Sequence, residues 1–159
     1  MGTFAVQIAK AFGAEVTGVC STRNVDMVRS IGADHVIDYT QEDFTLGGPR
    51  YDLILDNVAN RSFSDFRRAL TPQGTLIPNS GHSGLGYIIK AFVRSAFVRQ
   101  QGRPYIAIPT NEDLVDLKEL IESGKVTPVI DRTYPLGETP EAFRYLDQGH
   151  AQGKVVITV

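Results

Sequence analysis

The chain has 159 residues, 42% of them apolar and 21% charged, which is ordinary for a globular domain with a core of its own. Its formal net charge of −2 gives no electrostatic reason to expect a nucleic-acid partner. Cys20 is the single cysteine, so an internal disulfide is excluded, and with three scattered histidines it offers no spacing typical of zinc ligands.

The first residues read as a helix interrupted by polar positions, without the charged start and apolar run of a signal peptide. Together with the cysteine usage, this favours a cytoplasmic protein. The most apolar stretch, residues 85–98, is too short to span a bilayer and contains Lys90 and Arg94. It predicts an amphipathic helix facing a core or a partner, and no membrane span.

Helix and strand patterns alternate along residues 1–125, and Gly13 and Gly32 each end a predicted helix. The predicted helices cover residues 1–12, 24–31, 62–70, 85–98 and 111–122, with a further helix start at 40–43, and the predicted strands cover 16–20, 35–38, 51–56, 75–77 and 105–108. Residues 71–74 are predicted as a turn. In the helix at 111–122 we expect four apolar side chains to be buried, namely Leu114, Leu117, Leu120 and Ile121.

Short, nearly all-apolar strands that alternate with helices are typical of a parallel sheet covered on both faces. The sequence therefore predicts a doubly wound α/β domain. After Lys125 the pattern changes to a strand-like run over 126–136, a helix over 140–146 and a strand over 154–159. We interpret this strand-helix-strand segment as an appendage to the sheet, or as the return into a second domain.

The start of the chain resembles the second half of a βαβ unit, because a helix capped by glycine is followed by a strand. No strand precedes that helix, and the glycine-rich turn that would open it is reduced to Gly2. Either the protein begins with a plain helix or it is the back part of something longer. If a first strand is absent, the strand at 154–159 is a candidate to cover the exposed sheet edges.

In a doubly wound sheet, ligands bind beyond the carboxyl ends of the strands, and an acid about 20 residues past the glycine turn binds the ribose 2′-hydroxyl of NAD. Counting from Gly2 leads to Cys20 or Ser21, where no carboxylate stands. Ser21, Thr22 and Arg23 offer hydroxyls and a positive charge, which suit a 2′-phosphate and favour NADP(H) over NAD(H). Alternatively, Ser21, Thr22 and Asn24 only cap and turn the chain.

Catalytic residues are not evident from the spacing. Asp56 ends a predicted strand and is a possible catalytic acid, but carboxylates at strand ends often only bond to nearby backbone. Cys20 lies inside a predicted strand, where cysteine usually behaves as a small apolar residue. We therefore nominate no catalytic residue.

Four runs occur in the order GTFAVQIAKAFGAEVTGVCST, IGADHVIDY, YDLILDNV and GHAQGKVVITV. Together they resemble the medium-chain dehydrogenase/reductase superfamily, and more narrowly its zinc-free, quinone-oxidoreductase-like NADPH branch. The resemblance implies a Rossmann sheet that lacks its first strand, with residues 1–125 as an incomplete NAD(P)-binding domain and residues 126–159 returning toward a catalytic domain. It further implies that the chain begins inside the fingerprint, so that the N-terminal catalytic domain is absent and Gly2 and Thr3 are the end of the pyrophosphate loop.

The resemblance also implies positions along the cofactor. Ser21 and Arg23 would meet the adenosine 2′-phosphate, and Tyr39 would pack at the same end. The further positions implied are Asn57 along the cofactor, Ser80 toward the nicotinamide, Ala107 near its carboxamide, and His150, Ala151 and Gln152 in a cofactor-contacting turn. Relatives often carry arginine where Gln152 stands here.

These observations favour the cofactor-binding portion of an NADPH-dependent oxidoreductase that reduces quinones, enones or related carbonyls by hydride transfer. The expected partners are a nicotinamide dinucleotide, a small substrate in the full-length form and a second copy in a homodimer. A zinc-dependent alcohol dehydrogenase with its metal ligands elsewhere is an alternative. Others are a truncated remnant that binds the cofactor weakly and has no turnover, and an interaction module that uses residues 85–98.

Overall fold

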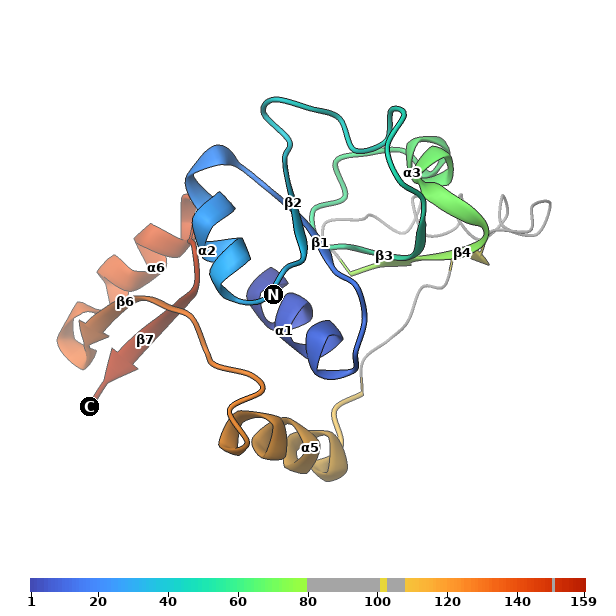
Figure 1. Ribbon diagram of the computed structural model, residues 1–159. Coiled ribbons are helices and arrows are strands. Elements are labelled where there is room, and N and C mark those ends of the chain that lie inside the picture. The colour runs from blue at the N-terminus through green and yellow to red at the C-terminus, as the bar shows by residue number, and fades with distance from the viewer. Residues whose placement is uncertain (80–100, 103–107, 150) are drawn as a thin grey trace. The chain divides into compact units, whose positions relative to one another are not determined.

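The computed structural model describes residues 1–79, 101–102, 108–149 and 151–159 (Figure 1). The chain divides into two compact units, one of Met1–Asp38 with Thr110–Val159 and the other of Tyr39–Pro109. The predicted helix at 85–98 and most of the predicted strand at 105–108 lie outside the described residues.

The first unit begins with α1 (Gly2–Ala11), β1 (Thr17–Cys20), a 3₁₀ turn η1 (Thr22–Asn24), α2 (Val25–Ser30) and β2 (His35–Asp38). β1 and β2 pair in parallel, with Thr17 opposite His35 and Cys20 opposite Asp38. Gly18 allows α2 to approach the strand closely, because a side chain there would overlap Val28 of the helix. Because β1 and β2 run in parallel, their carboxyl ends lie together at the same edge.

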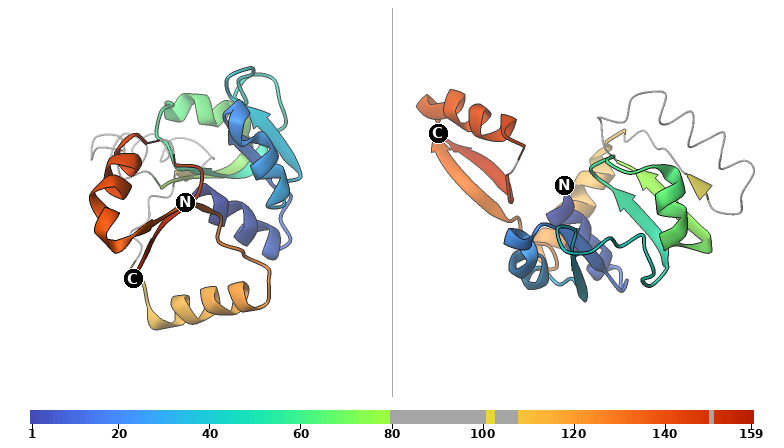
Figure 2. Two further views of the ribbon diagram at one scale, coloured as in Figure 1. Left: turned by 90° about the vertical axis from the view of Figure 1, so that its left-hand side faces the viewer. Right: turned by 90° about the horizontal axis from the view of Figure 1, so that it is seen from above.

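The same unit continues with α5 (Asn111–Glu122), β6 (Ile130–Pro135), a 3₁₀ turn η2 (Leu136–Glu138), α6 (Thr139–Asp147) and β7 (Lys154–Thr158). β6 and β7 pair in parallel, and α6 lies along one face of this pair (Figure 2). The predicted strand-helix-strand segment is thus present. Among the described residues β7 pairs only with β6, so the suggestion that it covers another sheet edge within this chain is wrong, whereas coverage between two chains stays a prediction.

The buried side chain of Gln7 ties α1 to the segment that leads into β6. Its Nε2 donates to the carbonyl oxygen of Thr127 at 3.0 Å, and the Thr127 amide donates to Gln7 Oε1 at 2.7 Å. The primary amide of Gln7 thus pairs with both backbone polar groups of one residue, as a neighbouring strand would. The first and last parts of the sequence are therefore joined within this unit.

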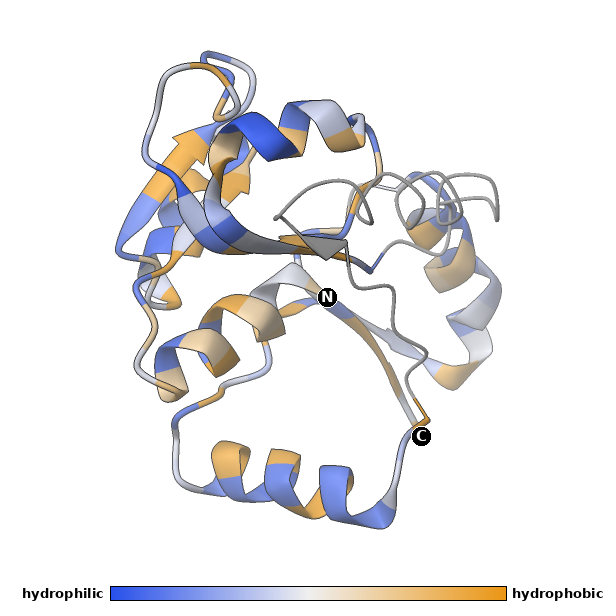
Figure 3. Ribbon diagram, turned by 90° about the vertical axis from the view of Figure 1, so that its right-hand side faces the viewer, coloured by the Kyte–Doolittle hydropathy of each residue, from blue (hydrophilic) through white to orange (hydrophobic). Residues whose placement is uncertain are grey.

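α5 begins as the sequence predicts but does not bury its apolar side. Thr110 caps the helix in a capping box with Asp113, one residue earlier than the predicted cap. Leu114 is 60% exposed and Ile121 37% exposed, and Leu117 and Leu120 are only half-buried. Figure 3 shows apolar and polar positions alternating along this helix, and the predicted burial of its four apolar residues is wrong because no described element covers that side.

The second unit contains β3 (Tyr51–Asp56), α3 (Phe63–Ala69), β4 (Leu70–Pro78) and β5 (Gln101–Gly102), with parallel strands in the order β3-β4-β5. Its core is a cluster of buried residues from α3 and β4, against which Phe44 and Ile54 pack, and the cluster comprises Phe63, Phe66, Leu70 and Leu76. The apolar spacing that predicted a one-sided helix at 62–70 thus places that side on β4.

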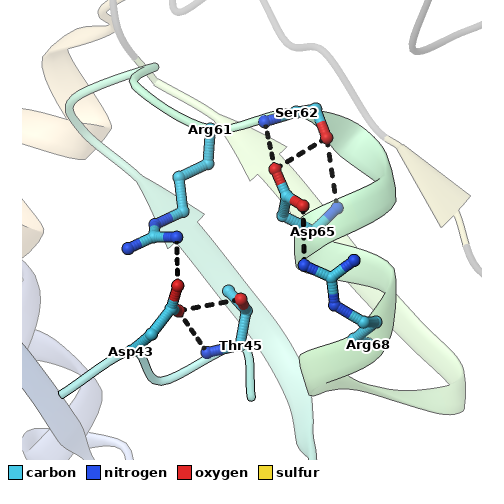
Figure 4. A network of polar contacts seen from close by, with 6 residues as sticks. All are labelled: Asp43, Thr45, Arg61, Ser62, Asp65 and Arg68. Carbon is cyan, nitrogen blue, oxygen red and sulfur yellow. Dashed lines mark hydrogen bonds and ion pairs between the residues drawn. The ribbon is translucent and has the colours of Figure 1, made fainter.

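Two local predictions in this unit are wrong. Residues 40–43 form no helix, because the Asp43 carboxylate accepts hydrogen bonds from the backbone N–H and the hydroxyl of Thr45 at 2.9 and 2.8 Å, and from Arg61 at 2.6 Å (Figure 4). Residues 71–74 belong to β4 rather than to a turn. The register between β3 and β4 shifts there, so the strand is irregular where the sequence carries Pro72 and Gly74.

The described part of the chain is a mixed α/β structure in which all paired strands are parallel. The strands form three separate ladders, which are β1-β2, β3-β4-β5 and β6-β7. β1 and β3 are end strands of their ladders, which leaves one edge of each without a described partner.

Candidate functional site

The predicted phosphate-binding residues follow β1 directly. Ser21 has an extended backbone and caps η1, and its Oγ accepts a hydrogen bond from Asn24 Nδ2 at 3.3 Å. The hydroxyl of Thr22 donates to Asp38 Oδ2 at 2.5 Å. Arg23 is exposed in the turn. The hydroxyl of Thr22 is therefore engaged by a carboxylate, whereas Ser21 acts as an acceptor toward Asn24 and keeps a hydrogen to donate.

The structure brings the predicted C-terminal turn to this place. Gln152 Nε2 donates to Asn24 Oδ1 at 2.9 Å, although the two residues are 128 positions apart. Ser21, Asn24 and Gln152 thus form a continuous line of hydrogen bonds at the end of β1. Asn24 was considered in the sequence only as a capping residue, and no local pattern reveals its contact with a distant turn.

The turn that carries Gln152 is held by β6 and α6. Asp131 Oδ2 accepts from the Gln152 backbone N–H at 2.8 Å and from the Tyr145 hydroxyl at 2.6 Å. These bonds, the Tyr145 one foremost, hold the pKa of the Asp131 carboxyl below its usual range. The Arg132 guanidinium lies 4.0 Å from the centre of the Tyr145 ring. The position of Gln152 is therefore set by a network of side chains rather than by the turn alone.

Cys20 and Asp38 face each other across β1 and β2. Burial, and then the nearby Asp38 carboxylate, raise the pKa of the Cys20 thiol. A thiol kept protonated is a poor nucleophile, which agrees with nominating no catalytic role for Cys20. Asp38 is the carboxylate closest along the ladder to the predicted phosphate position, and the sequence did not indicate that it would engage Thr22.

A second group of predicted residues lies at the carboxyl ends of β3 and β4. Asp56 is 6% exposed, and its Oδ1 accepts from the backbone N–H groups of Val58 and Ala59 at 3.0 and 2.9 Å. Asn79 Nδ2 donates to Asn57 Oδ1 at 2.7 Å. Ala59 has a positive φ of 57°, which these bonds stabilise. Asp56 thus shapes the loop that carries Asn57.

Asp56 Oδ2 is buried without a hydrogen-bond partner among the described residues. Such an atom costs free energy unless a donor reaches it. Among the described residues, Asp56 therefore has no partner at this oxygen for acid-base chemistry.

The remaining predicted residues are widely spread. Gly2 and Thr3 lie in the first turn of α1, where a Cβ on Gly2 would meet nothing within 4 Å. Tyr39 is 55% exposed and belongs to the second unit, and Ala151 is exposed beside Gln152. Ser80, Ala107 and His150 lie outside the described residues.

Among the residues with a described position, no three histidine, cysteine or acidic side chains gather as metal ligands would. In the same part of the chain, no helix has the length and the apolar composition needed to cross a bilayer.

Comparison with known proteins gives the family. The model of a family described as zinc-binding dehydrogenase matches residues 31–157, most of the chain. The chain belongs to this zinc-binding dehydrogenase family. Within it, the chain is a quinone-oxidoreductase-like member of the medium-chain dehydrogenase/reductase superfamily. The resemblance to the medium-chain dehydrogenase/reductase superfamily, and to its quinone-oxidoreductase-like members, is thereby confirmed.

Relatives of the chain include the mitochondrial NAD(P)H oxidoreductase RTN4IP1 of Mus musculus, 36% identical over all of this chain and 45% of the relative. A chloroplast envelope quinone oxidoreductase homolog of Arabidopsis thaliana is 35% identical over 99% of the chain and 49% of the relative. The structure is similar to a quinone oxidoreductase from Coxiella burnetii, with a TM-score of 0.82, 25% identity, and coverage of 99% of this chain and 49% of the other. The chain thus spans about half the length of the curated relatives it matches.

Proposed function

We propose that the chain is the cofactor-binding portion of an NADPH-dependent oxidoreductase, and that the adenosine end of NADPH binds at Ser21–Arg23. The observation that carries this proposal is the set of side chains at the end of β1. Ser21 accepts a hydrogen bond there and keeps its own hydrogen, Arg23 is exposed, and neither position 20 nor position 21 holds a carboxylate. A 2′-phosphate is recognised by such donors and repelled by an acid. Asp38 stands nearby but accepts the Thr22 hydroxyl hydrogen bond.

In the proposed enzyme the reduced nicotinamide ring supplies the hydride. The residues of this chain bind and orient. Ser21 donates to the phosphate, Arg23 supplies positive charge, and Asp56 shapes the loop that presents Asn57 through its bonds to Val58 and Ala59. No described side chain is nominated as a general acid or base, which suits hydride transfer to an acceptor that takes its proton from elsewhere.

The names of relatives suggest the substrate class. Two of these relatives are named NAD(P)H oxidoreductase and quinone oxidoreductase homolog, and each is about twice as long as the part that this chain matches. We extend to this chain the reduction of quinones, enones or related carbonyls, carried out in a protein that also contains a substrate-binding part. The named relatives are mitochondrial or chloroplastic, and a cytoplasmic location for this chain stays a prediction. Fractionation of cells that express the tagged chain distinguishes these locations.

We further propose that the parallel ladders belong to one doubly wound Rossmann sheet that lacks its first strand. This is supported by the edge of β3 that has no partner among the described strands, and by Leu53, which is 58% exposed although it lies in an apolar strand. Amide hydrogen exchange tests the point. Amides of β3 that are not bonded to β4 exchange fast in this chain and slowly when a preceding segment is present.

The binding proposal is tested with a ligand that carries only the adenosine end. Adenosine 2′,5′-bisphosphate and adenosine 5′-monophosphate differ by the 2′-phosphate and need no pyrophosphate loop. We expect calorimetric titration of the chain to give saturable binding of the bisphosphate, at least tenfold tighter than the monophosphate. Arg23→Ala reduces this preference. Arg29→Ala removes another exposed arginine, which forms an ion pair with Asp26 of α2 at 3.7 Å, and leaves the preference unchanged.

Equal affinity for the two nucleotides would contradict the proposal. Absence of binding to either, from a chain that circular dichroism shows to be folded, would favour a chain with no nucleotide-binding function of its own.

A further inference from the structure

We infer that Gln152 and Asn24 are positioning residues that make the Ser21 hydroxyl a hydrogen-bond donor toward the 2′-phosphate, so that Gln152 acts through Asn24 rather than by touching the cofactor. This inference rests on the proposed binding of NADPH at Ser21–Arg23. It concerns a line of three side chains, Gln152, Asn24 and Ser21, which we call the amide relay.

The direction of the hydrogen bonds in the amide relay decides what Ser21 can do. Gln152 Nε2 donates to Asn24 Oδ1 at 2.9 Å, so the opposite end of the Asn24 amide, Nδ2, points toward Ser21. Nδ2 donates to Ser21 Oγ at 3.3 Å. Because the serine oxygen accepts in this direction, its own hydrogen is directed elsewhere. Within the described chain no group accepts from it, and a phosphate oxygen beyond the end of β1 is the acceptor that fits.

Reversing the direction removes this donor. If residue 152 could only accept, Asn24 would present Nδ2 to it and Oδ1 to Ser21, and the serine hydrogen would be consumed inside the protein. Gln152→Glu makes this change with almost no change in size, since a carboxylate has acceptors and no donors. The Gln152→Glu variant can therefore still bond to Asn24, but only as an acceptor, so it tests the direction of the hydrogen bonds.

The turn that carries Gln152 is rigid enough for such a role. Asp131 fixes its backbone through the Gln152 N–H at 2.8 Å, and Lys154 N–H donates to the carbonyl oxygen of Val129 at 2.7 Å. The backbone from which the Gln152 side chain reaches Asn24 is thus held by two hydrogen bonds. A relay between the last and first parts of the chain also makes cofactor preference depend on correct docking of the β6-α6-β7 segment.

The test is a double-mutant cycle on the preference for adenosine 2′,5′-bisphosphate over adenosine 5′-monophosphate. Gln152→Glu is expected to lower this preference about tenfold or more, because a hydrogen bond to a charged group is lost. Gln148→Glu makes the same change at the end of α6, outside the relay, and reports the effect of the added charge alone, which is expected to be about threefold or less. In a Ser21→Ala background, Gln152→Glu then has no effect beyond that of the charge control.

The outcomes separate the two proposals. A wild-type chain without preference for the bisphosphate overturns the proposed function and the relay with it. A wild-type preference that Gln152→Glu and Gln148→Glu reduce equally, or that Gln152→Glu reduces just as much in the Ser21→Ala background, overturns the relay alone. Circular dichroism and the unfolding midpoint of each variant verify that only folded protein is compared.

Discussion

Replacing Gly153 by alanine places a methyl group against the backbone of β6. A Cβ at this position would overlap the carbonyl oxygen of Val129 and would lie 3.1 Å from the Asp131 nitrogen. These are main-chain atoms, which cannot rotate away as a flexible side chain can. The turn must therefore move away from β6, and two hydrogen bonds move with it, namely Lys154 N–H to Val129 O at 2.7 Å and Gln152 N–H to Asp131 Oδ2 at 2.8 Å.

The expected cost follows from these contacts. Overpacking of this kind costs about 1–3 kcal/mol, a neutral hydrogen bond contributes about 1 kcal/mol and one to a carboxylate about 1.5–3 kcal/mol. A single movement of the turn relieves the steric overlap and weakens both hydrogen bonds, so these costs are not added in full. We expect Gly153→Ala to lower the free energy of unfolding by about 2–4 kcal/mol. Urea unfolding followed by circular dichroism measures this change.

Gly137 provides the matched control in the same segment. A Cβ there would meet nothing within 4 Å, and its φ is not positive. Gly137→Ala is therefore expected to be neutral or to stabilise by up to about 1 kcal/mol, by restricting the unfolded chain. If Gly153→Ala changed stability by no more than about 0.5 kcal/mol, the close approach of the turn to β6 would be refuted.

Three further predictions concern the described contacts. Leu76→Ala empties a fully buried position in the core of the second unit and should cost about 2–5 kcal/mol in urea unfolding, and a cost below about 1 kcal/mol would contradict that packing. Ser62→Ala breaks the capping box of α3 and should cost about 1 kcal/mol, while Ser64→Ala on the same helix should not, and equal costs would refute the cap. Tyr145→Phe removes the strongest hydrogen bond that holds the Asp131 pKa down. That carboxylate stabilises the fold above about pH 4, the pKa of the unfolded chain, and this stabilisation is lost as pH falls through the folded pKa. The variant should raise the Asp131 pKa in an NMR titration and lose stability mainly above pH 4, and an unshifted pKa would contradict the assignment.

Most helices and strands were predictable because their signals are local. β3 covers the run of apolar residues 51–56 as predicted, and α3 lies between its serine cap and Leu70. The failures were of another kind. Burial of Leu114 in α5 requires a covering partner that periodicity does not supply, and at 40–43 the Asp43 bond to Thr45 displaced a helix start of ordinary appearance.

The candidate site divides in the same way. Ser21 and Arg23 could be identified because they follow a strand whose expected carboxylate is missing, which is a local feature. The contact of Gln152 with Asn24 joins residues 128 positions apart, and nothing in either segment alone indicates it. The division of the chain after residue 125 remains a prediction, as do the cofactor contacts of Asn57 and Tyr39.

The central claim is that the adenosine 2′-phosphate of NADPH binds at the end of β1. The most direct measurement is two-dimensional amide NMR of the ¹⁵N-labelled chain during titration with adenosine 2′,5′-bisphosphate. The account predicts saturable shifts concentrated at Ser21–Arg23, with the side-chain amides of Asn24 and Gln152 shifting alongside. Saturable shifts confined to other elements, such as α5, or no shifts at millimolar ligand, would contradict it.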